Sequence, residues 1–328
     1  MRISTRRKRE LLSAVALITA SGLAACTSGT DAPPPADASS QKGSSGFVEA
    51  SWRPLTEQDI PADSLGASIR RGLAILRNTP DSLPAYATSG LNCTSCHQQD
   101  GLKLSAAPLT GSHARFPKYM PRSGAVISLA DRVNYCFTRS LAGNALPVES
   151  REMADILAYL AFISKDVPVG TKIAGHDGII SMKDTLEGDT GRGEVVYKRD
   201  CVACHQADGQ GVPKAFPPLW GPKSYSIGAS MARLERAASF IWHNMPQTQP
   251  GKLTPQEAFD VAAYINSHAR PDSPGKEGDW PMGGAPKDVP YATQGHAAFN
   301  PPTLLTRASP KTSVVPNPPR APRQLKGE

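Results

Sequence analysis

A five-residue pattern, C-x-x-C-H, occurs twice in this chain of 328 residues and constrains its fold more than any other feature. Each copy is followed by Gln, one variable residue, Asp and Gly. In c-type cytochromes the two thiols of this pattern form thioethers with haem vinyl groups, and the imidazole becomes an iron ligand. We therefore predict two covalently attached haem c groups. The predicted attachment residues are Cys93, Cys96, Cys201 and Cys204, and the predicted proximal iron ligands are His97 and His205.

Two other uses of paired cysteines fit this pattern less well. A structural zinc ion needs four ligands gathered at one place, and a thioredoxin-like dithiol has no use for the adjacent histidine. One match to the haem signature could arise by accident, whereas two in similar surroundings favour a real pair. The chain is therefore expected to be a dihaem cytochrome c.

An internal repeat predicts how the chain divides into domains. The motifs begin 108 positions apart, and each half ends in a helical stretch with a similar apolar core around Tyr159 or Tyr264. Because no long alternating strand pattern appears, we predict an all-α fold of two tandem class I cytochrome c-like domains, each enclosing one haem. The predicted segments are domain 1 (47–166), an interdomain linker (167–187), domain 2 (188–283) and a Pro-rich basic tail (284–328).

Helical periodicity predicts an opening and a closing helix in each half, at 64–77, 150–164, 191–198 and 254–269. Thr254 followed by Pro255 is a typical helix start, with threonine as N-cap and proline at the first helical position. In the loop after each motif, Pro108 and Pro218 are expected to brace the haem-binding side. A backbone carbonyl near each proline should accept the N–H of the iron-ligating imidazole and fix its orientation.

The N-terminus is predicted to be an export signal. Residues 1–25 contain five basic residues and a short apolar run, and they end in Leu23-Ala24-Ala25 before Cys26. This end resembles a bacterial lipobox, which would make Cys26 a lipid attachment site; cleavage near Ala25 without lipidation is the alternative. Residues 27–46 are rich in Pro, Ala and Ser and are predicted to form a flexible linker. We therefore expect a periplasmic protein tethered to a membrane by a lipid anchor.

The formal net charge of +7 does not indicate a nucleic-acid-binding protein. Basic residues are concentrated in the leader and in the tail from Lys287 onward, so the predicted domains between them are nearly neutral. We expect no nucleic-acid partner.

The second axial ligand of each iron is expected to differ between the halves. Asn244-Met245-Pro246 precedes the last helix of the second half, where a class I cytochrome c presents its methionine. His205 and Met245 are therefore the predicted ligands of the second iron, a pair that suits electron transfer. Met231 and Met282 are weaker candidates for the same role.

The first half has no methionine at the matching position and offers Cys136 instead. An unpaired thiol is a liability in an oxidising compartment unless something protects or uses it, and an iron would do both. A thiolate ligand donates charge strongly and lowers the haem potential. The alternative is a buried, inert cysteine. Residues 125–141 are predicted to be one helix, with an apolar stripe of Val126, Leu129, Val133 and Phe137 beside a polar stripe of Arg132, Cys136 and Ser140.

The segment Arg132–Ser140, taken with the two haem motifs, resembles the bacterial thiosulfate dehydrogenases, dihaem enzymes that couple two thiosulfate ions into tetrathionate. The resemblance spans both halves, from about residue 91 to residue 264. It implies that Cys136 is the axial partner of the first haem and that Met245 ligates the second. It also implies that Arg122, Arg132 and Ser140 line the substrate pocket. Asn244 stands where some members have lysine, and Tyr135 stands where a glycine is expected.

The resemblance thus implies an oxidoreductase that forms tetrathionate at the first haem and passes electrons through the second haem to an external acceptor, such as a cytochrome. Arginines suit this reaction, because two dianions repel each other and sulfonate oxygens match a guanidinium fork. The alternatives are a non-catalytic dihaem electron carrier, a tetrathionate reductase and an enzyme for another sulfur compound.

Overall fold

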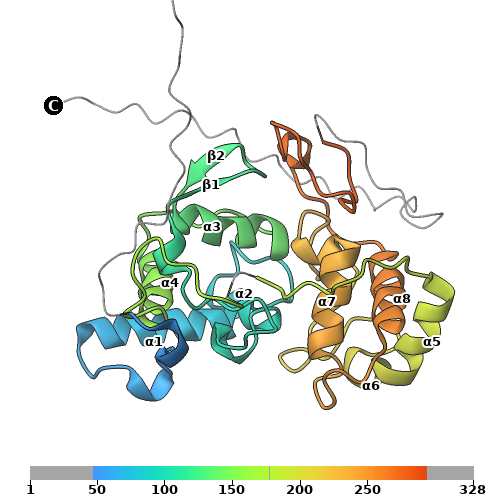
Figure 1. Ribbon diagram of the computed structural model, residues 1–328, viewed down its shortest axis with the longest axis horizontal. Helices are drawn as coiled ribbons and strands as arrows, with labels where there is room; N and C mark the ends of the chain where they lie inside the picture. Colours follow the sequence, from blue (N-terminus) through green and yellow to red (C-terminus); the bar gives the residue numbers. More distant parts are fainter. Residues whose placement is uncertain (1–46, 177, 294–328) are drawn as a thin grey trace, which may run out of the picture. The chain divides into compact units, whose positions relative to one another are not determined.

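The computed structural model describes residues 47–176 and 178–293 and folds them into two helical halves (Figure 1). The predicted leader, Cys26, the linker 27–46 and the tail beyond residue 293 lie outside the described residues. Among the residues that are described, no helix is long and apolar enough to cross a membrane.

The described residues form four α-helices in each half, and the first and last of each half are the predicted opening and closing helices. Those of the first half are α1 (Ser64–Arg77), α2 (Thr79–Ser82), α3 (Leu129–Tyr135) and α4 (Arg151–Phe162). Those of the second half are α5 (Thr190–Asp200), α6 (Val202–His205), α7 (Leu234–Asn244) and α8 (Pro255–Asn266). Short 3-10 turns lie at Glu49–Ser51, Glu57–Asp59, Cys93–Ser95, Gln99–Gly101, His113–Arg115, Ser230–Ala232 and Lys276–Gly278. The Thr254 side chain caps α8 as predicted, by accepting a hydrogen bond from the backbone N–H of Glu257.

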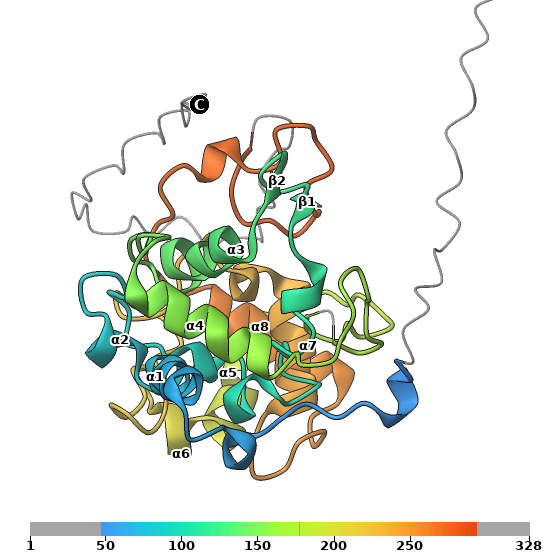
Figure 2. The ribbon, with the colours of Figure 1, turned by 90° about the vertical axis from the view of Figure 1, so that its left-hand side faces the viewer.

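The opening and closing helices of each half pack closely against each other, α1 on α4 and α5 on α8 (Figure 2). A glycine makes each close approach possible. A Cβ atom placed on Gly72 would lie 2.1 Å from the carbonyl oxygen of Asp155, and one placed on Gly193 would lie 2.0 Å from that of Asp260. The same aspartates each bind an arginine of the opposing helix, with 2.7 Å between Arg71 and Asp155 and 2.7 Å between Arg192 and Asp260. The internal repeat therefore extends to the helix crossing.

Replacing Gly193 with alanine should destabilise the second half by about 3 kcal/mol, because the added methyl group would force α5 away from the backbone of α8. The measurement is urea unfolding of the haem-loaded protein followed by circular dichroism. Gly191→Ala on the same helix is the matched control, since its Cβ would meet only Asp189 Oδ1, at 3.4 Å. Equal unfolding midpoints for the two variants would contradict this account of the crossing.

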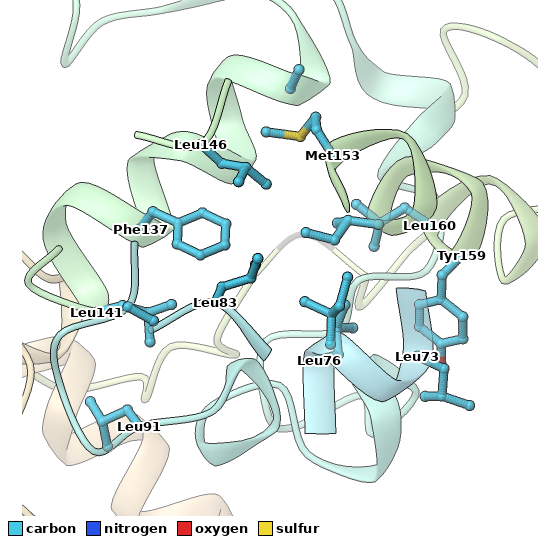
Figure 3. Packing of buried hydrophobic residues seen from close by; sticks show 14 of the residues in the cluster. Leu73, Leu76, Leu83, Leu91, Phe137, Leu141, Leu146, Met153, Tyr159 and Leu160 are labelled. Carbon is cyan, nitrogen blue, oxygen red and sulfur yellow. The ribbon is translucent and has the colours of Figure 1, made fainter. Parts of the chain in front are cut away.

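The core of the first half gathers around Leu76, Phe137, Met153 and Leu160 (Figure 3). Part of it comes from the second half of the sequence, because Tyr225, Ala229 and Ala232 are buried in the same cluster. Backbone hydrogen bonds from Gly90 to Lys223 and from Ser226 to Arg139 accompany this packing. A separate core, with Tyr197, Trp220 and Phe259, fills the second half. The segment following Trp220 thus joins the two halves.

One predicted helix is wrong at its start. Residues 118–127 form an antiparallel hairpin of β1 (Lys118–Met120) and β2 (Ala125–Ile127), so Val126 lies in a strand and is 68% exposed. The helix begins only after Ser128, whose side chain accepts a hydrogen bond from Asp131 N while the Asp131 carboxylate binds Ser128 N. This capping box stops the helix from extending backward into the hairpin.

The described beginning of the predicted tail packs against the folded part. Val289 is fully buried, and it forms a small apolar cluster with Trp280 and Tyr291. Asp288 accepts a hydrogen bond from Arg233, at 2.7 Å, in front of α7. Residues up to Thr293 therefore contribute to the structure around the second half.

Candidate functional site

The first C-x-x-C-H motif opens into an apolar cavity of the first half. Cys93, Cys96 and His97 line this cavity together with Cys136 and Ser140. The remaining lining is mostly aliphatic or aromatic, with Leu76, Leu91, Leu109, Val133, Phe137, Leu141, Ile156 and Leu160. Two thiols and two possible axial donors thus share one apolar cavity, which fits a covalently attached haem.

Local hydrogen bonds fix the start of this motif. The Asn92 side chain accepts from Thr79 N, at 2.8 Å, and the Thr79 hydroxyl accepts from Cys93 N, at 3.0 Å. Burial raises the pKa of the Cys93 thiol to about 11 and that of Cys96 to about 12. Neither cysteine forms a disulfide. The described residues also contain no cluster of three or more His, Cys, Asp or Glu side chains suited to a metal ion, so they offer nothing to the zinc alternative.

Both motif histidines are oriented as the sequence predicted. The Nδ1 atom of His97 lies 2.5 Å from the carbonyl oxygen of Ala107, and that of His205 lies 3.0 Å from the carbonyl oxygen of Pro217. Each acceptor directly precedes the proline that was expected to brace the loop. With the proton held on Nδ1, Nε2 carries the lone pair that an iron ligand needs.

Cys136 differs from the other cysteines of the cavity in its electrostatic surroundings. Burial acts to raise the pKa of its thiol, but the charge of Arg132 and hydrogen bonding with His97 outweigh burial and lower it to about 7. The Nη1 atom of Arg132 lies 3.4 Å from the Cys136 sulfur. The thiol of Cys136 is therefore the one in this cavity whose anion is stabilised by a fixed cation.

The backbone around Cys136 is not regular α-helix. After α3 the chain widens into a π-helical turn, Cys136–Ser140, before Leu141 ends it. Such turns occur often at functional sites because they redirect side chains within a helix. Here Cys136, Phe137 and Ser140 all line the cavity. The sequence placed Cys136 and Ser140 on one helical face, and the wider turn keeps them together.

Arg122 lies in a different set of contacts from Arg132. Its guanidinium donates to the Asp279 carboxylate at 2.9 Å, to the Gly228 carbonyl at 2.7 Å and to the Tyr291 hydroxyl. Arg139 donates to the other oxygen of Asp279, at 2.6 Å. Of the two arginines expected to line the substrate pocket, the structure therefore brings Arg132 to the thiol and holds Arg122 in an ion-pair network.

Sequence reasoning missed the other members of this network. Arg139 follows Cys136 by three positions, and its guanidinium stacks on the Tyr135 ring, 4.4 Å from the centroid. Asp279 and Tyr291 come from the end of the described chain, and Tyr291 donates to Asp279 at 2.7 Å. No local pattern marks these residues, because their partners lie far away in the sequence. Two arginines share one carboxylate here, so the network carries a net positive charge.

The second motif lies on α6, and its surroundings are aromatic. Cys201 packs against the core of the second half together with Met245, Trp220 and Tyr264. Burial lowers the pKa of the His205 imidazole, which favours its neutral form. Cys201 of the motif and the predicted ligand Met245 thus pack against one apolar core, which fits a second covalent haem.

Asn244, just before Met245, joins the two halves. It is fully buried, and its amide donates to the carbonyl oxygens of Ser105 and Phe240, both at 2.9 Å. Its oxygen accepts from the Ser105 hydroxyl at 2.8 Å. Ser105 stands two residues before Ala107, the acceptor of the His97 imidazole. The side chain before Met245 is therefore tied to the loop that orients His97.

Replacing Asn244 with alanine should lower the free energy of unfolding by about 2–3 kcal/mol, because buried polar groups on both sides would lose their partners. Ser105→Ala removes only one of these hydrogen bonds and should cost about 1 kcal/mol. Denaturant unfolding of both variants and the double variant measures the coupling between the residues. Strictly additive effects would show that the pair does not act as a unit.

Comparisons with known proteins find one cytochrome c domain in each half of the chain. Residues 85–169 match the family described as SoxA/TsdA, cytochrome c domain, and residues 191–269 match the cytochrome c family. A thiosulfate dehydrogenase of Psychrobacter arcticus is 40% identical over 238 residues, which cover 71% of this chain and 72% of that protein. One of Allochromatium vinosum is 43% identical over 221 residues, which cover 65% of this chain and 82% of that protein.

A solved structure is also similar. The thiosulfate dehydrogenase (TsdBA) from Marichromatium purpuratum matches with a TM-score of 0.66 and 29% identity. The match covers 75% of this chain and 58% of that one. Two cytochrome c domains, each with its own C-x-x-C-H motif, carry two covalent haem c groups. On the extent of these matches, the chain belongs to the thiosulfate dehydrogenase family of dihaem cytochromes c.

Proposed function

We propose that this protein couples two thiosulfate ions into tetrathionate in the cavity of the first half and passes the two electrons through the second half to an external acceptor. In this proposal His97 and Cys136 would hold the iron of the first haem, and His205 and Met245 would hold that of the second. The observation that carries it is the Arg132–Cys136 pair, a guanidinium 3.4 Å from a thiol that lines the cavity of the first haem motif. The relatives named as thiosulfate dehydrogenases supply the substrate class.

The charges of the substrates explain why cations are needed. Two thiosulfate dianions must meet to form one S–S bond, and in a partly desolvated site their repulsion is on the order of several kcal/mol. Arg132 lies beside the Cys136 thiol and can bind sulfonate oxygens through its fork. The Ser140 hydroxyl lines the same cavity and can donate one further hydrogen bond. Arg122 and Arg139 carry two positive charges against the single negative charge of Asp279, so together they contribute one net positive charge.

The reaction balances without a proton. Two thiosulfate ions lose one electron each, the S–S bond forms between them, and the product is one tetrathionate dianion. The bound haems supply one-electron acceptors for this step and for transfer to the outer partner. The chain holds the Cys136 thiolate in place, neutralises substrate charge through Arg132 and keeps water away with its apolar walls.

A non-catalytic electron carrier is the competing function. Such a protein needs two stable irons with ordinary ligands, and it has no use for a guanidinium fixed to a buried thiol. The asymmetry between Cys136 in one half and Met245 in the other favours the enzyme. The net direction, towards tetrathionate or back to thiosulfate, follows from the haem potentials and the acceptor.

Cytochrome c domains are typically found outside the cytoplasm. We propose further that the leader 1–25 directs export to the periplasm and that Cys26 carries a lipid anchor. The lipobox-like residues before Cys26 support this proposal. The enzyme and an acceptor cytochrome held at the same membrane surface would then meet by diffusing along that surface.

One experiment tests the catalytic proposal. The purified haem-loaded protein is mixed with thiosulfate and an artificial electron acceptor, while product is identified and low-temperature EPR spectra are recorded. We expect one tetrathionate per two electrons and two thiosulfates, together with a thiolate-type low-spin signal from one haem. Two ordinary signals without turnover would instead establish a carrier.

A further inference from the structure

Arg270 is a buried cation, and no acidic side chain in the described part of the chain pairs with it. It follows the last helix, α8, and is 8% exposed. Three other arginines, Arg122, Arg139 and Arg233, are less buried, with side chains 16–17% exposed. Each of these three binds a carboxylate within 2.8 Å. Within 47–176 and 178–293, no Asp or Glu forms an ion pair with Arg270.

The contacts of Arg270 satisfy some of its N–H groups but leave its charge uncompensated. Nη2 donates to the Ile265 carbonyl at 2.8 Å, and Nη1 lies 3.4 Å from the Leu219 carbonyl oxygen. The guanidinium also stacks on Tyr225, 4.2 Å from the ring centroid. An isolated buried charge costs several kcal/mol unless an opposite charge accompanies it. The site therefore requires an anion that the polypeptide described here does not provide.

The elements around Arg270 belong to both haem sites. Leu219 follows Pro217, whose carbonyl oxygen binds His205. Tyr225 is buried in the core of the first half, and Cys96 contributes to the shift that raises the pKa of its phenol, after burial as the main cause. The hydroxyl of Ser224, next to Tyr225, is also buried without a hydrogen-bond partner. A buried hydroxyl without a hydrogen-bond partner thus lies next to the tyrosine on which Arg270 stacks.

We propose that Arg270 binds a propionate carboxylate of one of the two haems. Each haem c brings two carboxylates, which are anions with fixed positions once the thioethers have formed. A guanidinium fork matches a carboxylate bidentately, and such a pair is favourable in a buried site. Arg270 is therefore a cofactor-binding residue, and this role does not depend on which sulfur compound the enzyme oxidises.

The sign of the expected effect follows from charge. The ferric haem carries one more positive charge than the ferrous haem, so a neighbouring cation disfavours oxidation and raises the reduction potential. Arg270→Gln should lower the potential of the haem whose propionate it binds and leave the other potential unchanged. If the lowered potential belongs to the haem with methionine-type spectra, the propionate is that of the second haem. If it belongs to the other haem, the propionate is that of the first.

The test is a potentiometric titration of the haem-loaded protein, combined with resonance Raman spectra of the propionate bending modes. Arg236→Gln is the matched control, because Arg236 is also bonded only to neutral oxygens, those of Ile179 and Ser181. It should change neither potential. Arg270→Lys keeps the charge, so its haem potential should stay close to that of the unchanged protein. This variant remains informative if Arg270→Gln folds poorly. The proposal is overturned if Arg270→Gln leaves both haem potentials and the propionate bands unchanged. It is also overturned if Arg270→Gln and Arg236→Gln shift a haem potential by the same small amount.

Discussion

Replacing Cys136 with methionine is expected to reduce thiosulfate turnover roughly 10²–10³-fold while both haems remain attached. The substitution exchanges an anionic sulfur for a neutral thioether at Cys136, where Arg132 and His97 outweigh burial and lower the pKa of the thiol to about 7. A neutral donor should also raise the reduction potential of the first haem, so this haem would hold electrons taken from the substrate more tightly. Steady-state kinetics, EPR and potentiometry of the same preparation measure these three effects together.

The Cys136→Met experiment needs a control in the same turn of the chain. Thr138 lies within the π-helical turn, bonds only to the Asn134 carbonyl at 3.1 Å and is not among the cavity-lining residues. Thr138→Val should keep both the turnover and the thiolate signal. If the Cys136→Met protein carries two haems and works at the normal rate, the thiolate has no catalytic role and the proposed function loses its basis.

The second large effect concerns Arg132. Changing it to glutamine should lower kcat/KM for thiosulfate about 100-fold, because the cation nearest the thiol would no longer offset the charge of the two dianions. Arg132→Lys restores charge without the fork and should recover only part of this loss. Kinetics at low and high salt separate the contribution of Arg132 from that of exposed charges, since salt screens an exposed cation more than one that is partly buried.

Comparison with Arg122 makes this prediction specific to the site. Arg122 is held by Asp279, Gly228 and Tyr291, so Arg122→Gln should reduce kcat/KM less than Arg132→Gln and should also lower thermal stability. Arg70→Gln serves as a control, because Arg70 donates only to the carbonyl oxygens of Ile60 and Pro61. Equal losses in the two site variants would place both arginines on the substrate and contradict the ranking.

Much of the fold could be predicted because its signals are local. The haem motifs occupy five consecutive residues, and the opening and closing helices show periodicity over three or more turns. The carbonyl acceptors of His97 and His205 were predictable because each lies in a short loop before a proline. The hairpin at 118–127 was missed because Val126 fits both a helical stripe and a strand.

From the sequence alone we predicted the cysteines to which two haems attach, the histidines that should ligate their irons and the half that carries an unusual sulfur, because each of these depends on residues a few positions apart. Arg132 and Cys136 already share one predicted helical face, whereas the pairing of Arg122 with Asp279, 157 positions away, follows from the packing of the folded chain. The same packing brings Asn244 to Ser105 and buries Arg270 away from every carboxylate of the described residues. Such pairings depend on how separate elements pack. A buried charge or amide needs a partner, but the residues around it in the sequence do not indicate which distant residue that partner is.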